Sequence, residues 1–381
     1  MITRILRRLS VFLAIFFSAA LATPAAAGQL YAGEEAISAA GYPAIARFTK
    51  GDPDKPLLVF VPGAHHMARV AYGGHDGARR EDFLAHWLAR KGYSLLALSY
   101  PMDSQSKAFD TAHPDFTARA WGRQVAEIAA RKIQENGLSR RVVLLAWSMG
   151  GKVVQPAYEA SREAGLEMEG AIALAATPGI PGLISLVSRL NKAPSGYLAR
   201  PSAYDGYFRQ VQAQGHRNGR EAVPEAVFKR EYVGDFSINL LGYGEVYRDG
   251  AFHVDVMAQA NDYKAFSFDD YPLVGVIMPT DPADSRHAIT DQSLWAIYNS
   301  NTVLHVALVK AKIDPAVLPA ERWRGLVDLA RSLEDRLTVE VSGNHFFFIG
   351  EDGARATAEA VEQLIGKIRS VRRDIVALGQ K

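Results

Sequence analysis

The chain has 381 residues, of which 48% are hydrophobic and 22% charged; it contains no cysteine, and its formal net charge is +2. These values are typical of a folded globular protein and argue against disorder, collagen-like repeats and a multispan membrane protein. The absence of cysteine excludes disulfides, thiolate metal sites and a cysteine nucleophile. It leaves the redox compartment open, because an exported protein does not need disulfides.

The first 27 residues have the layout of a secretory signal peptide. Three arginines precede an apolar run over residues 9–22, and three consecutive alanines at 25–27 offer a small-x-small cleavage site. The apolar run of 14 residues is short for a membrane span. We therefore expect cleavage near Ala27 rather than an uncleaved membrane anchor.

Cleavage changes the charge of the chain. Removal of residues 1–27 leaves 40 basic and 41 acidic side chains, a formal charge of −1. A near-neutral chain without a basic stripe is not typical of nucleic-acid binding. We expect an exported protein, periplasmic or secreted, with no nucleic-acid partner and no stable membrane insertion after cleavage. The sequence leaves the oligomeric state open.

From residue 44 onward, apolar runs of strand length alternate with helix-like stretches. Strands are predicted at 57–61, 94–100, 142–147, 171–175, 303–309 and 337–341, and helices near 79–91, 116–136, 150–164, 319–333 and 354–368. Continuous apolar runs are typical of strands buried on both faces, and their alternation with helices indicates right-handed crossovers. The sequence therefore predicts an α/β fold with a mostly parallel, doubly wound sheet.

Residues 178–300 interrupt this alternation. They are rich in glycine, proline and aromatic residues, and they show no regular strand–helix rhythm. We interpret them as an aromatic-rich cap inserted into one sheet domain that spans residues 28–381. Without the cap this domain has about 230 residues, a length that single α/β domains reach.

The sharpest chemical signal is the segment Ala146-Trp147-Ser148-Met149-Gly150-Gly151, which follows a predicted strand and precedes a predicted helix. A serine at such a turn projects its hydroxyl above the sheet, and small neighbours relieve crowding in the strained backbone. The helix directs its N-terminal amides, and the positive end of its dipole, to the same place. We therefore predict that Ser148 is a nucleophile rather than a helix cap.

With this turn the chain resembles the α/β-hydrolase superfamily over residues 44–177 and 302–381, although alanine replaces the first glycine of the Gly-x-Ser-x-Gly pattern. The resemblance implies a Ser–acid–His triad in that chain order. It also implies an oxyanion hole made of two backbone amides. One belongs to the residue after the nucleophile, Met149, and the other to the loop after the first strong strand.

That loop reads Val61-Pro62-Gly63-Ala64-His65-His66, where the family usually has His-Gly. The glycine lets the backbone bend, and we expect the Ala64 amide to be the second oxyanion donor. His65 and His66 could line the site or bind a metal. Neighbouring side chains of an extended loop point apart, so we do not expect them to share a metal ion.

The predicted general base is His345, which follows the last predicted strand and lies in a loop similar to the family's Gly-His loop. The alternative is a histidine that only packs against the three phenylalanines after it. His287 and His305 precede the expected acid and so break the chain order.

Two segments compete for the acid. The predicted strand 303–309 leads to Asp314, and its Asp-Pro-x-x-x-Pro run resembles the family's acid loop. The apolar run 273–278 leads to Asp281, with Asp284 close behind. We favour Asp314 over Asp281, with Asp284 third, because one helix and one strand then separate the acid from His345. Each aspartate could instead cap a helix.

These residues predict acyl transfer, in which His345 deprotonates Ser148, the acid orients the imidazole, and water hydrolyses the acyl-enzyme. The scheme needs neither a metal nor an organic cofactor. We expect an exported esterase acting on a small or medium apolar ester. Peptidase, amidase, thioesterase or acyltransferase chemistry would use the same triad, and a non-catalytic binding protein on this scaffold is the alternative of another class.

Overall fold

The computed structural model describes residues 30–183 and 191–379. The predicted signal peptide, residues 1–27, lies outside these ranges. Within them, none of the helices has the length and hydropathy that crossing a membrane requires.

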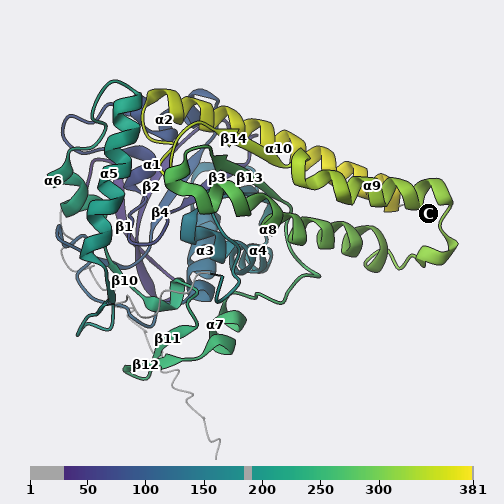
Figure 1. Cartoon of the computed structure of the whole chain (residues 1–381), viewed down its shortest axis with the longest axis horizontal. Helices are drawn as coiled ribbons and strands as arrows, with labels where there is room; N and C mark the ends of the chain where they lie inside the picture. Colours follow the sequence, from purple (N-terminus) through teal and green to yellow (C-terminus); the bar gives the residue numbers. More distant parts are fainter. Residues whose placement is uncertain (1–29, 184–190, 380–381) are drawn as a thin grey trace, which may run out of the picture.

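The centre of the molecule is an eight-stranded sheet (Figure 1). Its strands are β1 (Glu34–Ala39), β2 (Tyr42–Thr49), β3 (Leu57–Val61), β4 (Leu95–Ser99), β6 (Arg141–Trp147), β7 (Glu167–Leu174), β13 (Val274–Pro279) and β14 (Thr338–Val341). Their order across the sheet is β1-β2-β4-β3-β6-β7-β13-β14; β2 is antiparallel to both β1 and β4, and the strands from β4 to β14 are parallel to one another. The expected α/β fold with a mostly parallel sheet is confirmed.

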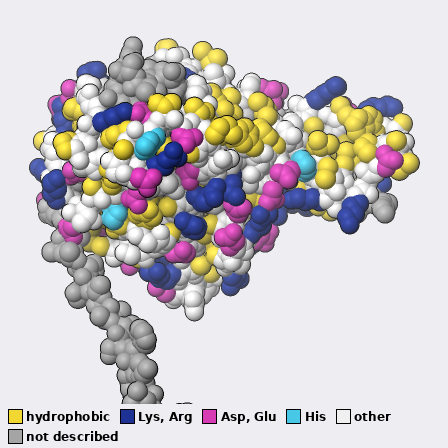
Figure 2. Space-filling view, turned by 90° about the horizontal axis from the view of Figure 1, so that it is seen from below, with side chains coloured by type: hydrophobic (Ala, Val, Ile, Leu, Met, Phe, Trp, Pro, Cys, Tyr) yellow, Lys and Arg dark blue, Asp and Glu magenta, His cyan; other side chains and the backbone are white. Residues whose placement is uncertain are grey.

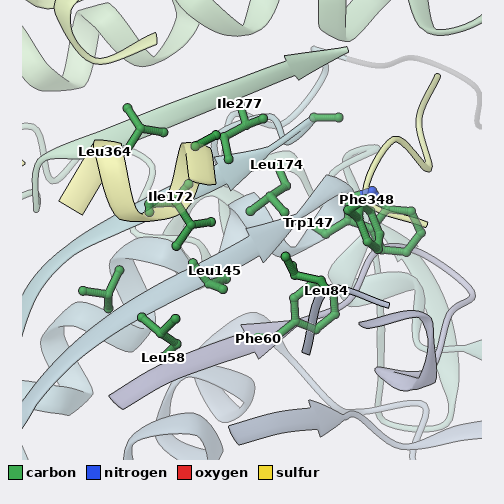
Figure 3. Packing of buried hydrophobic residues seen from close by; sticks show 14 of the residues in the cluster. Leu58, Phe60, Leu84, Leu145, Trp147, Ile172, Leu174, Ile277, Phe348 and Leu364 are labelled. Carbon is green, nitrogen blue, oxygen red and sulfur yellow. The ribbon is translucent and has the colours of Figure 1, made fainter. Parts of the chain in front are cut away.

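Helices cover both faces of the sheet, which is why its strands are apolar on both sides. Leu57 and Val59 of β3 pack in one core with α3 (Ala118–Asn136) and α4 (Val154–Glu163). Leu58 and Phe60 of the same strand pack in the other core with α2 (Leu84–Arg90) and α10 (Glu351–Gly379). Figure 3 shows this second core, where Phe60, Trp147 and Phe348 meet near the end of β6. The core thus extends to the segment that carries Ser148.

Residues 30–183 and 191–379 contain further helices. They are α1 (Arg69–Tyr72), η1 (Arg80–Asp82), η2 (Ser148–Val153), α5 (Pro201–Arg217), α6 (Glu225–Val227), η4 (Phe228–Tyr232), η5 (Ile238–Leu240), α7 (Val256–Asp262), η6 (Pro282–Asp284), α8 (Ser285–Leu304), η7 (His305–Val309), η8 (Pro315–Val317) and α9 (Ala320–Arg336).

Two expectations about the second half of the chain are wrong. Residues 303–309 do not form a strand, because α8 runs to Leu304 and continues as the helical turn η7. The sheet resumes earlier than expected, at β13, so the part of 178–300 that lies outside the sheet ends before residue 274. The buried residues of α8 recur every three or four positions, so this periodicity outweighs the β-branched residues at its end.

The segment between β7 and β13 forms a cap of small elements, drawn along the left and the bottom of Figure 1. Its strands are β8 (Asn191–Lys192), β9 (Leu198–Ala199), β10 (Gly234–Phe236), β11 (Glu245–Arg248) and β12 (Ala251–Val254). A strand from the sheet domain, β5 (Met102–Ser104), pairs with β10, which gives a second sheet of order β5-β10-β9-β8. This shared sheet fixes the cap to the main domain.

On the right of Figure 1, the ends of α8 and α10 project beyond the sheet together with η7 and α9. We call this projection, residues 297–336 and 369–379, the arm. Figure 2 shows hydrophobic side chains gathered on it. The large apolar side chains exposed there are Ile297, Leu304, Val309, Val317, Trp323 and Val376.

Candidate active site

Ser148 lies at a sharp turn between the central strand β6 and the helical segment η2. Its φ is +54°, a left-handed conformation that non-glycine residues rarely adopt. The turn is closely packed: a Cβ added at Gly150 would lie 3.0 Å from the Val61 carbonyl oxygen, and one at Gly151 would lie 2.3 Å from that of Thr177. Small residues are therefore required after the serine, as the sequence pattern suggested.

His345 lies in the loop between β14 and α10 and contacts Ser148 directly. Its Nε2 is 2.9 Å from Ser148 Oγ, and its Nδ1 is 2.7 Å from Asp284 Oδ2. The His345 and Asp284 side chains are only about a tenth exposed. Trp147 fixes the loop, because its indole N–H donates to the His345 carbonyl oxygen over 3.1 Å. The three side chains thus form one continuous chain of hydrogen bonds.

Three features identify the fold. They are the mostly parallel sheet, the strained serine between its central strand and a helix, and the histidine after its last strand. The chain has the α/β-hydrolase fold. This confirms the resemblance stated from the sequence at the level of the fold.

Comparisons with known proteins find similarity to solved structures at low sequence identity. No protein family and no curated protein matches the sequence. A thioesterase domain from a curacin biosynthetic pathway is similar at 14% identity, covering 86% of this chain and 98% of the domain, with a TM-score of 0.40. An esterase from Rhodococcus sp. is similar at 16% identity, covering 88% of this chain and 98% of its own, with a TM-score of 0.39. A thermophilic esterase from Thermogutta terrifontis is similar at 13% identity, covering 88% of this chain and 98% of its own, with a TM-score of 0.40. We base the fold on the chain's own sheet order and serine turn.

The expectation that Asp314 lies beside His345 is wrong. Asp314 caps η8 on the arm, where its Oδ1 accepts a hydrogen bond from the Ala316 amide over 2.9 Å. The error follows from the strand expected at 303–309. Because this segment is helical, the chain after it leads onto the arm and not to the edge of the sheet.

The neighbouring candidate Asp281 is also a cap. Its Oδ1 accepts a hydrogen bond from the Ala283 amide, and its Oδ2 pairs with Arg217. Asp284, three residues later, is the carboxylate that reaches His345. Because β13 lies directly beside β14, the segment that follows β13 leaves the sheet next to the histidine loop.

The expected oxyanion amides belong to segments that border Ser148. A Cβ added at Gly63 would lie 2.7 Å from Ser148 Cβ and 3.2 Å from its Oγ, so the backbone at Gly63, next to Ala64, lies directly against the serine. Met149 begins the helical segment after Ser148, and amides of a first helical turn have no partner within their helix. The positions of Ala64 and Met149 suit an oxyanion hole, and their role as donors stays a prediction.

His65 and His66 are both buried and bond to different backbone oxygens. The Nδ1 of His65 donates to the Gly234 carbonyl over 3.0 Å, and that of His66 donates to the Ala64 carbonyl over 2.7 Å. Burial lowers the pKa of both imidazoles to about 3, so both are neutral near pH 7. Both rings pack against Tyr207 of the cap. They therefore form part of the contact between the cap and the loop over residues 61–66, which we call the oxyanion loop after its expected role.

Sequence reasoning missed a second group of buried polar side chains close to His345. His287 and Asp291 of α8 are completely buried and joined by a hydrogen bond of 2.9 Å. Lys152, one turn after Ser148, is buried with its Nζ 3.4 Å from Thr177 Oγ1. Burial, reinforced by the charge of Arg286, lowers the pKa of Lys152 to about 7. Polar residues spaced by three and four on an otherwise buried helix face were the signal available for His287 and Asp291.

Asp284, His287 and His345 are the one group in residues 30–183 and 191–379 whose ligand atoms are arranged to hold a metal ion, all within 4.8 Å of one another. Two of the three are already paired, since the Asp284 carboxylate accepts from His345 Nδ1. Coordination through this Nδ1 would remove the proton that it donates to Asp284. The residues therefore fit a triad better than a metal centre.

Proposed function

We propose that this protein is a serine hydrolase that cleaves carboxylic esters through an acyl-enzyme intermediate. The observation that carries the proposal is the unbroken chain of hydrogen bonds Ser148–His345–Asp284, with its serine at a strained turn. A nucleophile, a base and an orienting acid in mutual hydrogen-bond distance are what nucleophilic acyl transfer requires.

Each residue has one task in the proposed reaction. The Nε2 of His345 accepts the Ser148 proton as the hydroxyl attacks the ester carbonyl, and the proton then passes to the leaving alcohol. Asp284 accepts the hydrogen bond from Nδ1, which holds the required tautomer and stabilises the imidazolium. The amides of Ala64 and Met149 bind the oxyanion. Water, deprotonated by His345, releases the acid and restores Ser148.

We propose a small or medium ester with an apolar acyl or alcohol part as the substrate. This proposal is supported by aromatic side chains near the site, because Tyr207 of the cap and Phe346 both pack against His66 in the oxyanion loop. Export through the predicted signal peptide is part of the same proposal.

A fluorophosphonate probe tests the nucleophile. We expect wild-type protein to be labelled and Ser148→Ala to be unlabelled and inactive. Labelling that persists in a folded Ser148→Ala variant would refute the proposal.

A series of p-nitrophenyl esters of increasing acyl length, beside thioester and aminopeptide substrates, tests the bond that is cleaved. Turnover of the peptide substrate alone would make the enzyme a peptidase.

The acid is tested by a matched pair of variants. Asp284→Asn retains the shape of the side chain but favours the wrong tautomer of His345, and we expect kcat to fall about 10⁴-fold. Asp314→Asn, on the arm, is the control and should keep wild-type kcat. The opposite result in steady-state ester hydrolysis would restore Asp314 as the acid.

A further inference from the structure

One face of α8 continues from the triad acid into the protein core. Asp284 precedes the helix, and His287 and Asp291 follow three and seven positions later, so all three lie on the same side. Only 1% of His287 and none of Asp291 is exposed to solvent. The proposed reaction does not use either residue, yet burial of such polar groups is unfavourable unless their hydrogen bonds are satisfied.

The hydrogen bonds of His287 determine its tautomer. Arg286 Nη2 lies 2.6 Å from His287 Nε2, and a guanidinium can only donate, so Nε2 is the acceptor. The proton is therefore on Nδ1, which donates to Asp291 Oδ2 over 2.9 Å. Burial, with the nearby charges of His345 and Arg286, lowers the pKa of His287 well below its ordinary value. His287 is thus a neutral ring in a fixed orientation.

This neutral ring stacks on His345. The two imidazole centroids are 5.0 Å apart and the ring planes differ by 26°. Trp147 also contacts His345, at 5.1 Å and 39°. The His345 ring must direct Nε2 at Ser148 and Nδ1 at Asp284 simultaneously, and a stacked neighbour restricts rotation out of that plane. Because His287 is neutral, it adds no charge that would oppose the imidazolium formed during catalysis.

We propose that His287, held by Asp291, is a positioning residue that fixes the ring plane of His345. It acts through His345, on which its ring stacks. The inference rests on the proposed function, in which His345 is the general base.

The test compares His287→Ala with the double variant His287→Phe, Asp291→Leu. The alanine variant removes the stacked ring, and misplacing a catalytic group should lower both kcat and the rate of fluorophosphonate labelling about tenfold to a hundredfold, with KM unchanged. The double variant keeps a ring and removes both members of the buried hydrogen bond, which can be nearly neutral for stability. It should retain kcat within a few-fold. His305→Ala, in η7, is the control and should behave as wild type.

Rescue by added imidazole distinguishes the loss of His345 positioning from general damage to the structure. Imidazole should restore the labelling rate of His287→Ala by occupying the vacated space, but it should not restore His345→Ala. The proposal is overturned if folded His287→Ala keeps wild-type kcat, if only KM changes, or if imidazole has no effect and the double variant is equally impaired. Failure of the proposed function is visible separately, as a wild-type protein that the probe does not label at Ser148.

Discussion

Ser148 is held in a left-handed conformation by the backbone on both sides of its turn. The φ of +54° costs an L-residue about 1–2 kcal/mol. The backbone at Gly150 and Gly151 packs closely against the Val61 and Thr177 carbonyls, since a Cβ at these glycines would lie 3.0 and 2.3 Å from the respective oxygens. The strain is thus maintained by packing, and it presents the hydroxyl to His345.

Because the backbone at Ser148 is strained, we expect glycine to be more stable than alanine at this position, the reverse of their order within a helix. Glycine adopts positive φ without a Cβ penalty, so Ser148→Gly should be more stable than Ser148→Ala by about 1 kcal/mol. Ser293, within α8, is the matched control, because there glycine should be about 1 kcal/mol less stable than alanine. Urea unfolding of the four variants measures both differences, and the same sign at both positions would contradict the prediction.

A substitution at Gly63 should also disturb Ser148. In Gly63→Ala the new methyl would lie 2.7 Å from Ser148 Cβ, so the serine or the oxyanion loop must move. A displacement of this kind should lower kcat about 10²-fold. Gly366→Ala in α10 is the control, because a Cβ there meets nothing within 4 Å. Steady-state ester hydrolysis checks both variants. An unchanged kcat in Gly63→Ala would contradict the prediction, because it would show that the loop can move without loss of activity.

At the scale of elements, the cap and the oxyanion loop are paired through their backbones. The Gly234 amide donates to the His65 carbonyl over 3.0 Å, and the Met67 amide donates to the Tyr232 carbonyl over 2.9 Å. The His65 ring adds a bond to the Gly234 carbonyl. The cap therefore holds the loop that is expected to supply an oxyanion donor. A displacement of β10 should consequently displace this loop beside Ser148.

This coupling predicts that a cap substitution distant from Ser148 lowers activity. A Cβ at Gly234 would lie 2.6 Å from the Asp103 carbonyl oxygen, so Gly234→Ala must separate β10 from β5. We expect kcat to fall toward the roughly 10²-fold loss that removal of one oxyanion donor causes. Gly206→Ala in α5 of the cap has space for its methyl and should leave kcat unchanged. Equal activity of the two variants would show that cap and loop are independent.

At the scale of the whole molecule, a buried ion pair attaches the first strand to the sheet domain. Arg69 Nη2 and Nε bond to Glu34 at 2.7 and 2.8 Å, and both side chains are fully buried. The Tyr72 hydroxyl donates to the same carboxylate over 2.5 Å. Burial alone would raise the pKa of Glu34, but the hydrogen bonds and charge of Arg69 outweigh it and lower this pKa below 4.5.

The lowered pKa gives the stability a defined pH dependence. A carboxylate with a depressed folded pKa stabilises fully above its unfolded pKa, and this contribution is lost as the pH falls through the folded value. Glu34→Gln should therefore cost about 3–5 kcal/mol at pH 7, and the difference from wild type should shrink as the pH falls below about 4. Urea unfolding across this range is the measurement. The exposed Glu359→Gln is the control, and a difference independent of pH would contradict the assignment.

The sequence by itself determined the features that arise within short segments. The order strand, serine, small residues, helix is local, so it predicted Ser148 and its turn, and the continuous apolar runs predicted most of the parallel sheet. His345 was predictable because it follows the last strand directly. A short apolar run such as 303–309, by contrast, suits either a strand or a helix, and only its packing in α8 and η7 decided between them.

The tertiary structure alone decided which aspartate pairs with His345. Asp281, Asp284 and Asp314 all stand beside a proline-led turn that begins a helical segment, so their local sequences do not distinguish them. The choice depends on which strand lies beside β14, and that neighbour is β13. The same applies to His287, whose contact with His345 joins residues far apart in the chain. Local chemistry can be read from neighbours in sequence, whereas the partner of a side chain depends on which strands become neighbours in space.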